Sequence, residues 1–68
     1  MPARYRLIKP ILGMFTADGQ HDSVTVPSGE VVDTSGKKFN GEKLMEVLWN
    51  GKKVMMFTED LRNYTVAA

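Results

Sequence analysis

Hydrophobic positions in the last third of the chain form two short apolar runs separated by an Asn-Gly pair. The runs cover residues 43–49 and 52–57, and the pair is Asn50-Gly51. Both central residues of a type I′ turn need a positive φ, which Asn and Gly adopt most easily. Asn-Gly between apolar runs is therefore typical of a two-residue β-hairpin. The pattern predicts such a hairpin over residues 43–57.

The two-residue turn also predicts which residues of this hairpin lie opposite each other. Trp49 pairs with Lys52, and the pairing continues outward to Leu44 and Phe57. Since side chains alternate between the faces of a strand, the ribbon has two distinct faces. The first face, which we assign to the core, holds Met45, Val47, Val54 and Met56. The second face, also largely apolar, holds Leu44, Glu46, Leu48, Lys53, Met55 and Phe57.

Earlier in the chain, shorter patterns predict further strands. An apolar stretch at 11–16, an Asp18-Gly19 turn and a period-two alternation at 23–26 predict an arm-like hairpin of about 13–26. Pro27-Ser28-Gly29 predicts a tight turn. A short strand at 30–33 follows it, and residues 34–42 indicate an irregular loop.

Residues 58–62 carry the one helical signal. Thr58 is a good N-cap residue, and Glu59 and Asp60 suit the positive end of a helix dipole. The segment is too short for more than one turn, so we expect a 3₁₀ turn, followed by a final strand that ends near Val66.

Three segments together resemble the SH3-like barrel family. Residues 24–32 are similar to the diverging turn, residues 47–54 to the distal hairpin, and residues 57–61 to the 3₁₀ turn before the last strand. The pattern covers residues 11–67 and is also similar to small stand-alone bacterial proteins of this type. The resemblance implies an all-β fold, a small SH3-like barrel of five to six antiparallel strands. It implies no activity. Thr58 stands where proline usually precedes the 3₁₀ turn, and paired tryptophans are missing, which argues against recognition of proline-rich peptides.

Composition limits the classes of function. The 68 residues predict one domain, with residues 1–10 as an N-terminal extension. The chain has no cysteine and a single histidine, His21, so we expect no metal site and no cofactor. His21 lies in a polar turn and the acids near residue 60 suit the helical turn, so we expect no enzymatic activity. There is no long apolar run and no signal-peptide pattern, which predicts a soluble, cytoplasmic protein that does not enter a membrane.

The second face of the hairpin is the candidate site. Either residues 4–11 fold over it, or it is exposed and binds a protein partner or a second copy of the chain, giving a homo-oligomer. Trp49 is either a core-edge residue or a stacking residue for a ligand. The predicted partner-binding residues are Leu48, Trp49, Met55, Phe57 and Phe39. We expect a small interaction module that buries apolar surface.

A lysine cluster gives the alternative function. Lysines beside a stacking aromatic residue are what single-stranded nucleic acid binding needs, and Phe39 supplies the aromatic ring. The net charge of +1 argues against a general polyanion binder. The candidate residues for nucleic acid binding are Lys37, Lys38, Lys52 and Lys53.

Overall fold

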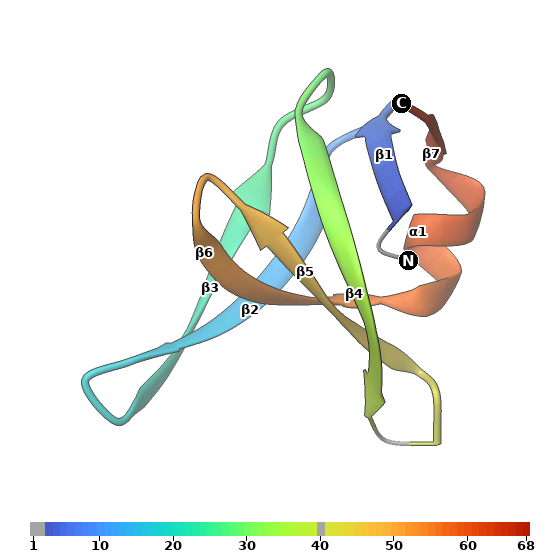
Figure 1. Ribbon diagram of the computed structural model, residues 1–68. Helices are drawn as coiled ribbons and strands as arrows, with labels where there is room; N and C mark the ends of the chain where they lie inside the picture. Colours follow the sequence, from blue (N-terminus) through green and yellow to red (C-terminus); the bar gives the residue numbers. More distant parts are fainter. Residues whose placement is uncertain (1–2, 40) are drawn as a thin grey trace.

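The computed structural model describes residues 3–39 and 41–68 (Figure 1). In this part of the chain there are seven strands and one short helix. Their bounds are β1 Ala3–Leu7, β2 Ile11–Ala17, β3 Gln20–Val26, β4 Val31–Phe39, β5 Leu44–Trp49, β6 Lys52–Phe57, α1 Thr58–Asn63 and β7 Thr65–Ala67. The all-β class is confirmed, although seven strands replace the expected five to six.

All seven strands belong to one antiparallel sheet. Its order is β3-β2-β6-β5-β4-β1-β7, so β3 and β7 are the end strands. Figure 1 shows the strong twist of the sheet, with the β2–β3 hairpin projecting from one side and α1 beside β1 and β7. Residues 3–7, which we placed in an N-terminal extension, are strand β1 and pair with both β4 and β7.

The β5–β6 hairpin has the predicted register. Trp49 lies opposite Lys52, Val47 opposite Val54 and Leu44 opposite Phe57. The turn residues have φ values of 51° at Asn50 and 77° at Gly51, as a type I′ turn requires. The two faces deduced from the sequence are therefore the faces of the folded ribbon.

The arm-like hairpin is also present. Strands β2 and β3 pair along their whole length from Ile11–Val26 to Ala17–Gln20 around the Asp18-Gly19 turn. The arm meets the rest of the sheet at a short contact, where Gly13 lies opposite Met56 on β6. A Cβ atom at Gly13 would lie 2.3 Å from Cγ1 of Val54, so this close approach of two strands needs a residue without a side chain.

The core lies on one side of the sheet, under α1. It takes one or two residues from each of the first six strands and one from the helix. Its members are Leu7, Ile11, Val26, Val32, Val47, Val54, Met56 and Leu61. Leu61 is the buried residue of α1, and it anchors the helix to the sheet. We call this side of the sheet the inner face.

Two local expectations were wrong. Most of the loop expected at 34–42 is the second half of β4, which continues to Phe39. Its pairing with β5 shifts register between Thr34 and Lys38, and Gly36 within the shift has a φ of 84°. A β-bulge thus absorbs the glycine that indicated a loop.

The helical turn is an α-helix rather than a 3₁₀ turn, and its N-cap residue is Phe57 rather than Thr58. The Thr58 hydroxyl instead donates a hydrogen bond to the carbonyl oxygen of Glu42, at 2.7 Å. Glu59 and Asp60 occupy the first turn, as expected from the helix dipole.

Candidate functional site

The side of the sheet opposite the core also carries a band of apolar residues. Met55 on β6 lies at its centre, because it pairs with Met14 on β2 and with Glu46 on β5. The same alternation and pairing add residues from four neighbouring strands. We call this surface the outer face and define it by Leu12, Met14, Phe39, Leu44, Leu48, Met55 and Phe57.

Large apolar side chains of the outer face are accessible to solvent. The exposed fractions are 45% for Leu12, 40% for Phe39, 40% for Leu48 and 43% for Phe57. Single exposed apolar residues are normal on a protein surface, but several on adjacent strands of one face indicate a contact surface. The outer face is therefore the best candidate for a binding surface on the molecule.

A depression lies within the outer face. Leu44 is only 8% exposed although it is on the side away from the core. Together with the half-buried Met14 and Met55 it lines a cavity of about 400 Å³, which His21 and Ser23 of β3 border. Methionine side chains adapt readily to the shape of a neighbour. The outer face thus offers a hollow that is apolar on the side of Met14, Leu44 and Met55 and polar along β3, where Asp22 also lines it.

No helix of the described chain packs on the outer face. Residues 4–11, the alternative cover named from the sequence, instead supply most of β1 in the plane of the sheet and the first residue of β2. Helix α1 packs on the inner face through Leu61. Within residues 3–39 and 41–68, therefore, Leu12, Phe39, Leu48 and Phe57 of the outer face remain exposed, whereas Leu44 is buried and Met14 and Met55 are half-buried.

Charged groups border the outer face. Arg4 and Asp33 form an ion pair of 2.9 Å between Nε and Oδ1 on the same side of the sheet. The hydrogen bond from Arg4 to Asp33, with the attraction between the charges, raises the pKa of Arg4. Nearer the centre, Glu46 lies opposite Met55 and Lys53 lies opposite Leu48. The only ion pair within the described chain is the one between Arg4 and Asp33, so Glu46 and Lys53 are not paired there.

Of the five predicted partner-binding residues, the structure brings four together. Leu48, Met55, Phe57 and Phe39 lie on the outer face. Trp49 lies on the inner face, where it packs against the edge of the core. Its indole Nε1 donates a hydrogen bond of 2.9 Å to Oε1 of Glu30, so its polar atom is satisfied inside the protein.

The four candidate lysines do not converge. Lys53 is on the side of the outer face, whereas Lys52 pairs with Trp49 and Lys38 pairs with Met45 on the inner face. The Lys52 ammonium lies 5.9 Å from the centre of the Phe15 ring, and Phe39 is on the opposite side of the sheet. Lys37 is in the β4 bulge. The lysines therefore do not form one cationic surface around Phe39.

Two residues of the outer face were missed from the sequence. Leu12 and Met14 belong to a run, Ile11-Leu12-Gly13-Met14, in which both alternating sets are apolar. Such a run is typical of a strand with two apolar faces. This pattern could have placed Leu12 and Met14 on a second apolar face. Their position next to Met55 depends on the pairing of β2 with β6, which joins distant segments of the chain.

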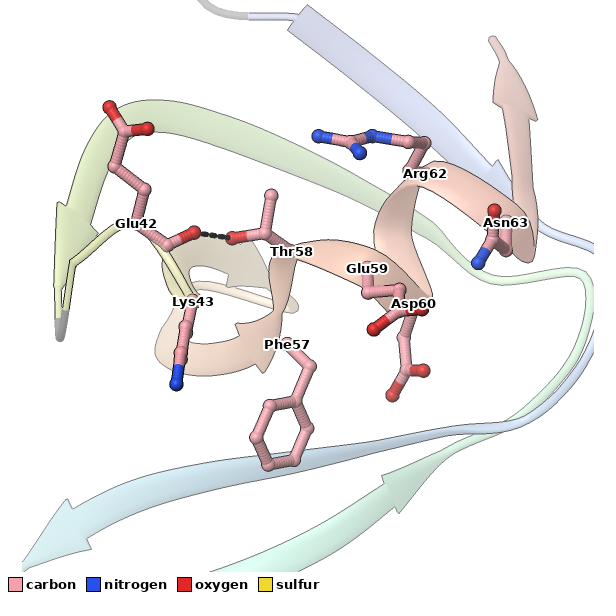
Figure 2. Close-up of a pocket in the computed structure, with 8 residues that line it drawn as sticks. All are labelled: Glu42, Lys43, Phe57, Thr58, Glu59, Asp60, Arg62 and Asn63. Carbon is pink, nitrogen blue, oxygen red and sulfur yellow. Dashed lines mark hydrogen bonds between the residues drawn. The ribbon is translucent and has the colours of Figure 1, made fainter.

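A further cavity, of about 730 Å³, lies beside α1, and the outer-face residue Phe57 is part of its lining (Figure 2). Figure 2 shows the Thr58–Glu42 hydrogen bond, with the side chains of Lys43, Glu59 and Asp60 around it. The cavity is lined by both acidic and basic side chains, and none of them forms an ion pair with another described residue. The Glu59 and Asp60 carboxylates lie on the exposed first turn of the helix and do not form a defined acid–base pair.

The remaining polar chemistry is sparse. The His21 ring nitrogen Nδ1 lies 3.3 Å from the Thr16 hydroxyl across the exposed arm. No third group orients this pair in the described structure, as a nucleophile and base would need. In residues 3–39 and 41–68 there is also no cluster of three His, Asp or Glu side chains that could hold a metal ion. The described chain contains no helix long and apolar enough to cross a membrane.

Comparison of the chain with protein-family models, with curated proteins and with solved structures finds no match. The candidate site is therefore assigned from the geometry of this chain alone.

Proposed function

We propose that this protein is a small non-enzymatic interaction module that associates with a second copy of itself through the outer face. The observation that carries the proposal is the uncovered apolar band across β2, β6, β5 and β4, with four large side chains at least 40% exposed. Burying such a band in an interface removes apolar area from water, which is the main driving force for association.

The small size of the domain gives a reason for self-association. Chains of this length bury only about 60% of their unfolded surface and are marginally stable alone. This chain has no cysteine, so disulfides cannot add stability. Two sheets pack face to face at about 10 Å when their facing sides are apolar. The outer faces of two copies meet this condition and give each protomer a second core.

The charged residues of the outer face support a symmetric dimer. A twofold interface places the same surface patch of each subunit against the other. The outer face presents one acid, Glu46, and one base, Lys53, on adjacent strands. A twofold axis between these two positions pairs each Glu46 with the partner copy's lysine. An isologous dimer thus satisfies both charges without any further partner.

We also propose that the sheet is of the SH3-like barrel type. The chain order supports this: the arm, the Pro27-Ser28-Gly29 turn, the β5–β6 hairpin, a helical turn and a last strand follow one another as in that family. The backbone N–H of Glu30 bonds to the carbonyl of Pro27 in the tight turn, and that of Gly29 bonds to Leu7 of β1. The turn is thereby tied to the first strand.

Sedimentation equilibrium tests the proposed function. We expect the wild-type protein to form dimers with a dissociation constant in the micromolar range, on the order of −8 kcal/mol. Leu48→Asp places a charge on the outer face at a side chain that is 40% exposed, so the fold is retained while the dimer dissociates.

Ile8→Asp is the matched control. Ile8 is 51% exposed, lies in the connection between β1 and β2 and is not one of the residues that define the outer face. We expect this variant to remain dimeric. A wild-type protein that stays monomeric up to about 1 mM, which corresponds to roughly −4 kcal/mol, contradicts self-association. Equal dissociation of both variants contradicts the assignment to the outer face.

A further inference from the structure

A second cavity on the inner face has a lining unlike the others. It has a volume of about 360 Å³ and is lined by residues of α1 and of β1, β4, β5 and β7. This volume is within the usual range for sites of small molecules, about 300–1,000 Å³. The lining residues are Tyr5, Thr34, Lys38, Met45, Thr58, Leu61, Arg62 and Thr65.

The charge of this cavity is positive. Lys38 of β4 and Arg62 of α1 both line it, and its described lining includes no carboxylate. The hollow on the outer face and the cavity of about 730 Å³ beside α1 each include at least one aspartate or glutamate. Neither cation is in an ion pair with a described residue. In Figure 2 the Arg62 guanidinium points away from the carboxylates of Glu59 and Asp60. Two uncompensated cations thus border one hollow.

The remaining lining is hydroxyl and apolar. The hydroxyls of Thr34, Thr58 and Thr65 donate to the carbonyl oxygens of Ala3, Glu42 and Leu61. Their protons are already used, so these oxygens are left as acceptors. Met45 and the buried Leu61 provide apolar surface beside them. The cavity therefore combines cationic donors, an apolar wall and hydroxyl acceptors.

We propose that this cavity binds a small organic acid. The carboxylate accepts charge-assisted hydrogen bonds from Lys38 and Arg62, the latter in the fork geometry that guanidinium groups give to carboxylates. The body of the acid packs on Met45 and Leu61, and a hydroxyl on that body donates to the threonine oxygens. The site is on the opposite side of the sheet from the outer face, so it does not depend on the dimer.

Nuclear magnetic resonance titration with benzoate and 4-hydroxybenzoate tests this site. For molecules of this size we expect dissociation constants in the millimolar range. The amide signals that shift are expected to belong to residues 34–38, 45, 58–62 and 65. Benzyl alcohol, which has the same ring without the charge, is the matched ligand control and is expected to bind at least about tenfold more weakly. Tighter binding of 4-hydroxybenzoate than of benzoate supports the role of the threonine oxygens.

Variants identify the two cations. We expect Lys38→Gln and Arg62→Gln each to weaken benzoate binding about tenfold, the loss of one charge-assisted hydrogen bond. Both side chains are exposed, so the fold is retained. Lys37→Gln is the control, because Lys37 is adjacent in sequence but is not in the lining. Equal binding of benzoate and benzyl alcohol, or equal loss in the Lys37 variant, overturns the proposal. Either result leaves the test of the outer face unaffected.

Discussion

The inner and outer faces of the β5–β6 hairpin are both rich in apolar residues, yet they differ in exposure. On the inner face, Val47, Val54 and Met56 are at most 1% exposed. On the outer face, Leu48 and Phe57 are 40% and 43% exposed. The two sets alternate along the same two strands, so secondary structure and composition do not account for the difference.

The difference arises from what packs on each face. The inner face is covered by α1 and by the strands that curve around it, which contribute Leu61 and Leu7 to the core. No helix of the described chain packs on the outer face, where Leu48 and Phe57 remain exposed. A strand with two apolar faces is typical of a sheet that is covered on both sides. This comparison is the basis of our proposal that a second copy of the chain supplies the second layer.

The largest expected effect compares the same substitution on the two faces. Met56→Ala removes a side chain that is fully buried, and we expect the free energy of unfolding to fall by about 2–5 kcal/mol. Met55→Ala, one residue away on the outer face, is expected to cost less than about 1 kcal/mol when the protein is dilute. Urea unfolding measured by circular dichroism provides both values.

Protein concentration sharpens this comparison. If the protein dimerises as proposed, association stabilises the fold at high concentration, and Met55→Ala removes part of the proposed interface. The cost of Met55→Ala is therefore expected to increase with concentration, while that of Met56→Ala changes little. Equal costs at all concentrations would show that the outer face is not an interface.

A smaller effect tests the contact between the arm and the hairpin. Gly13→Ala places a Cβ atom 2.3 Å from Cγ1 of Val54, so a strand must shift. We expect a loss of about 1–3 kcal/mol in the free energy of unfolding, which is typical of overpacking. Val54→Ala removes the clashing methyl group. The double variant is therefore expected to be more stable than the sum of the single changes predicts, and strict additivity would contradict the close approach.

The smallest expected effect concerns charge on the outer face. We expect Glu46→Lys and Lys53→Glu each to weaken the dimer about threefold to tenfold, because each places like charges opposite each other across the twofold axis. The variant carrying both substitutions exchanges the two signs and restores the pairing. Its dissociation constant, measured by sedimentation, is expected to return close to that of the wild type. A double variant as weak as the single ones would contradict the twofold arrangement.

Local turn chemistry made part of the fold predictable from the sequence. Asn50-Gly51 and Asp18-Gly19 both have positive φ at each turn residue, and each predicted its hairpin. The register of the first of these hairpins in turn predicted the two apolar faces. These features depend on residues that are close in sequence, which is why alternation and turn type were sufficient.

Features that depend on distant pairing were not predictable. Strand β1 lies between β4 and β7, and β2 contacts β6 at Gly13 and Met14. Nothing local specifies these neighbours, so Leu12 and Met14 were missed from the candidate site. Trp49 was included among the partner-binding residues because of its residue type, and the structure instead agrees with the alternative position at the edge of the core. Trp49 is adjacent to Leu48 in β5, so their side chains point to opposite faces of the sheet. The predicted pairing of Trp49 with Lys52 therefore already placed Trp49 on the inner side.

The central claim is that a second copy of the chain covers the outer face. The most direct test is an isotope-filtered nuclear Overhauser experiment on a mixture of methionine-methyl-labelled and unlabelled protein. We predict intermolecular signals from the methyl groups of Met14 and Met55 and none from that of Met56, which is buried in the core. Absence of signals at Met14 and Met55 in a confirmed dimer would show that the copies meet elsewhere, for example at the free edge of β3, and would contradict the claim.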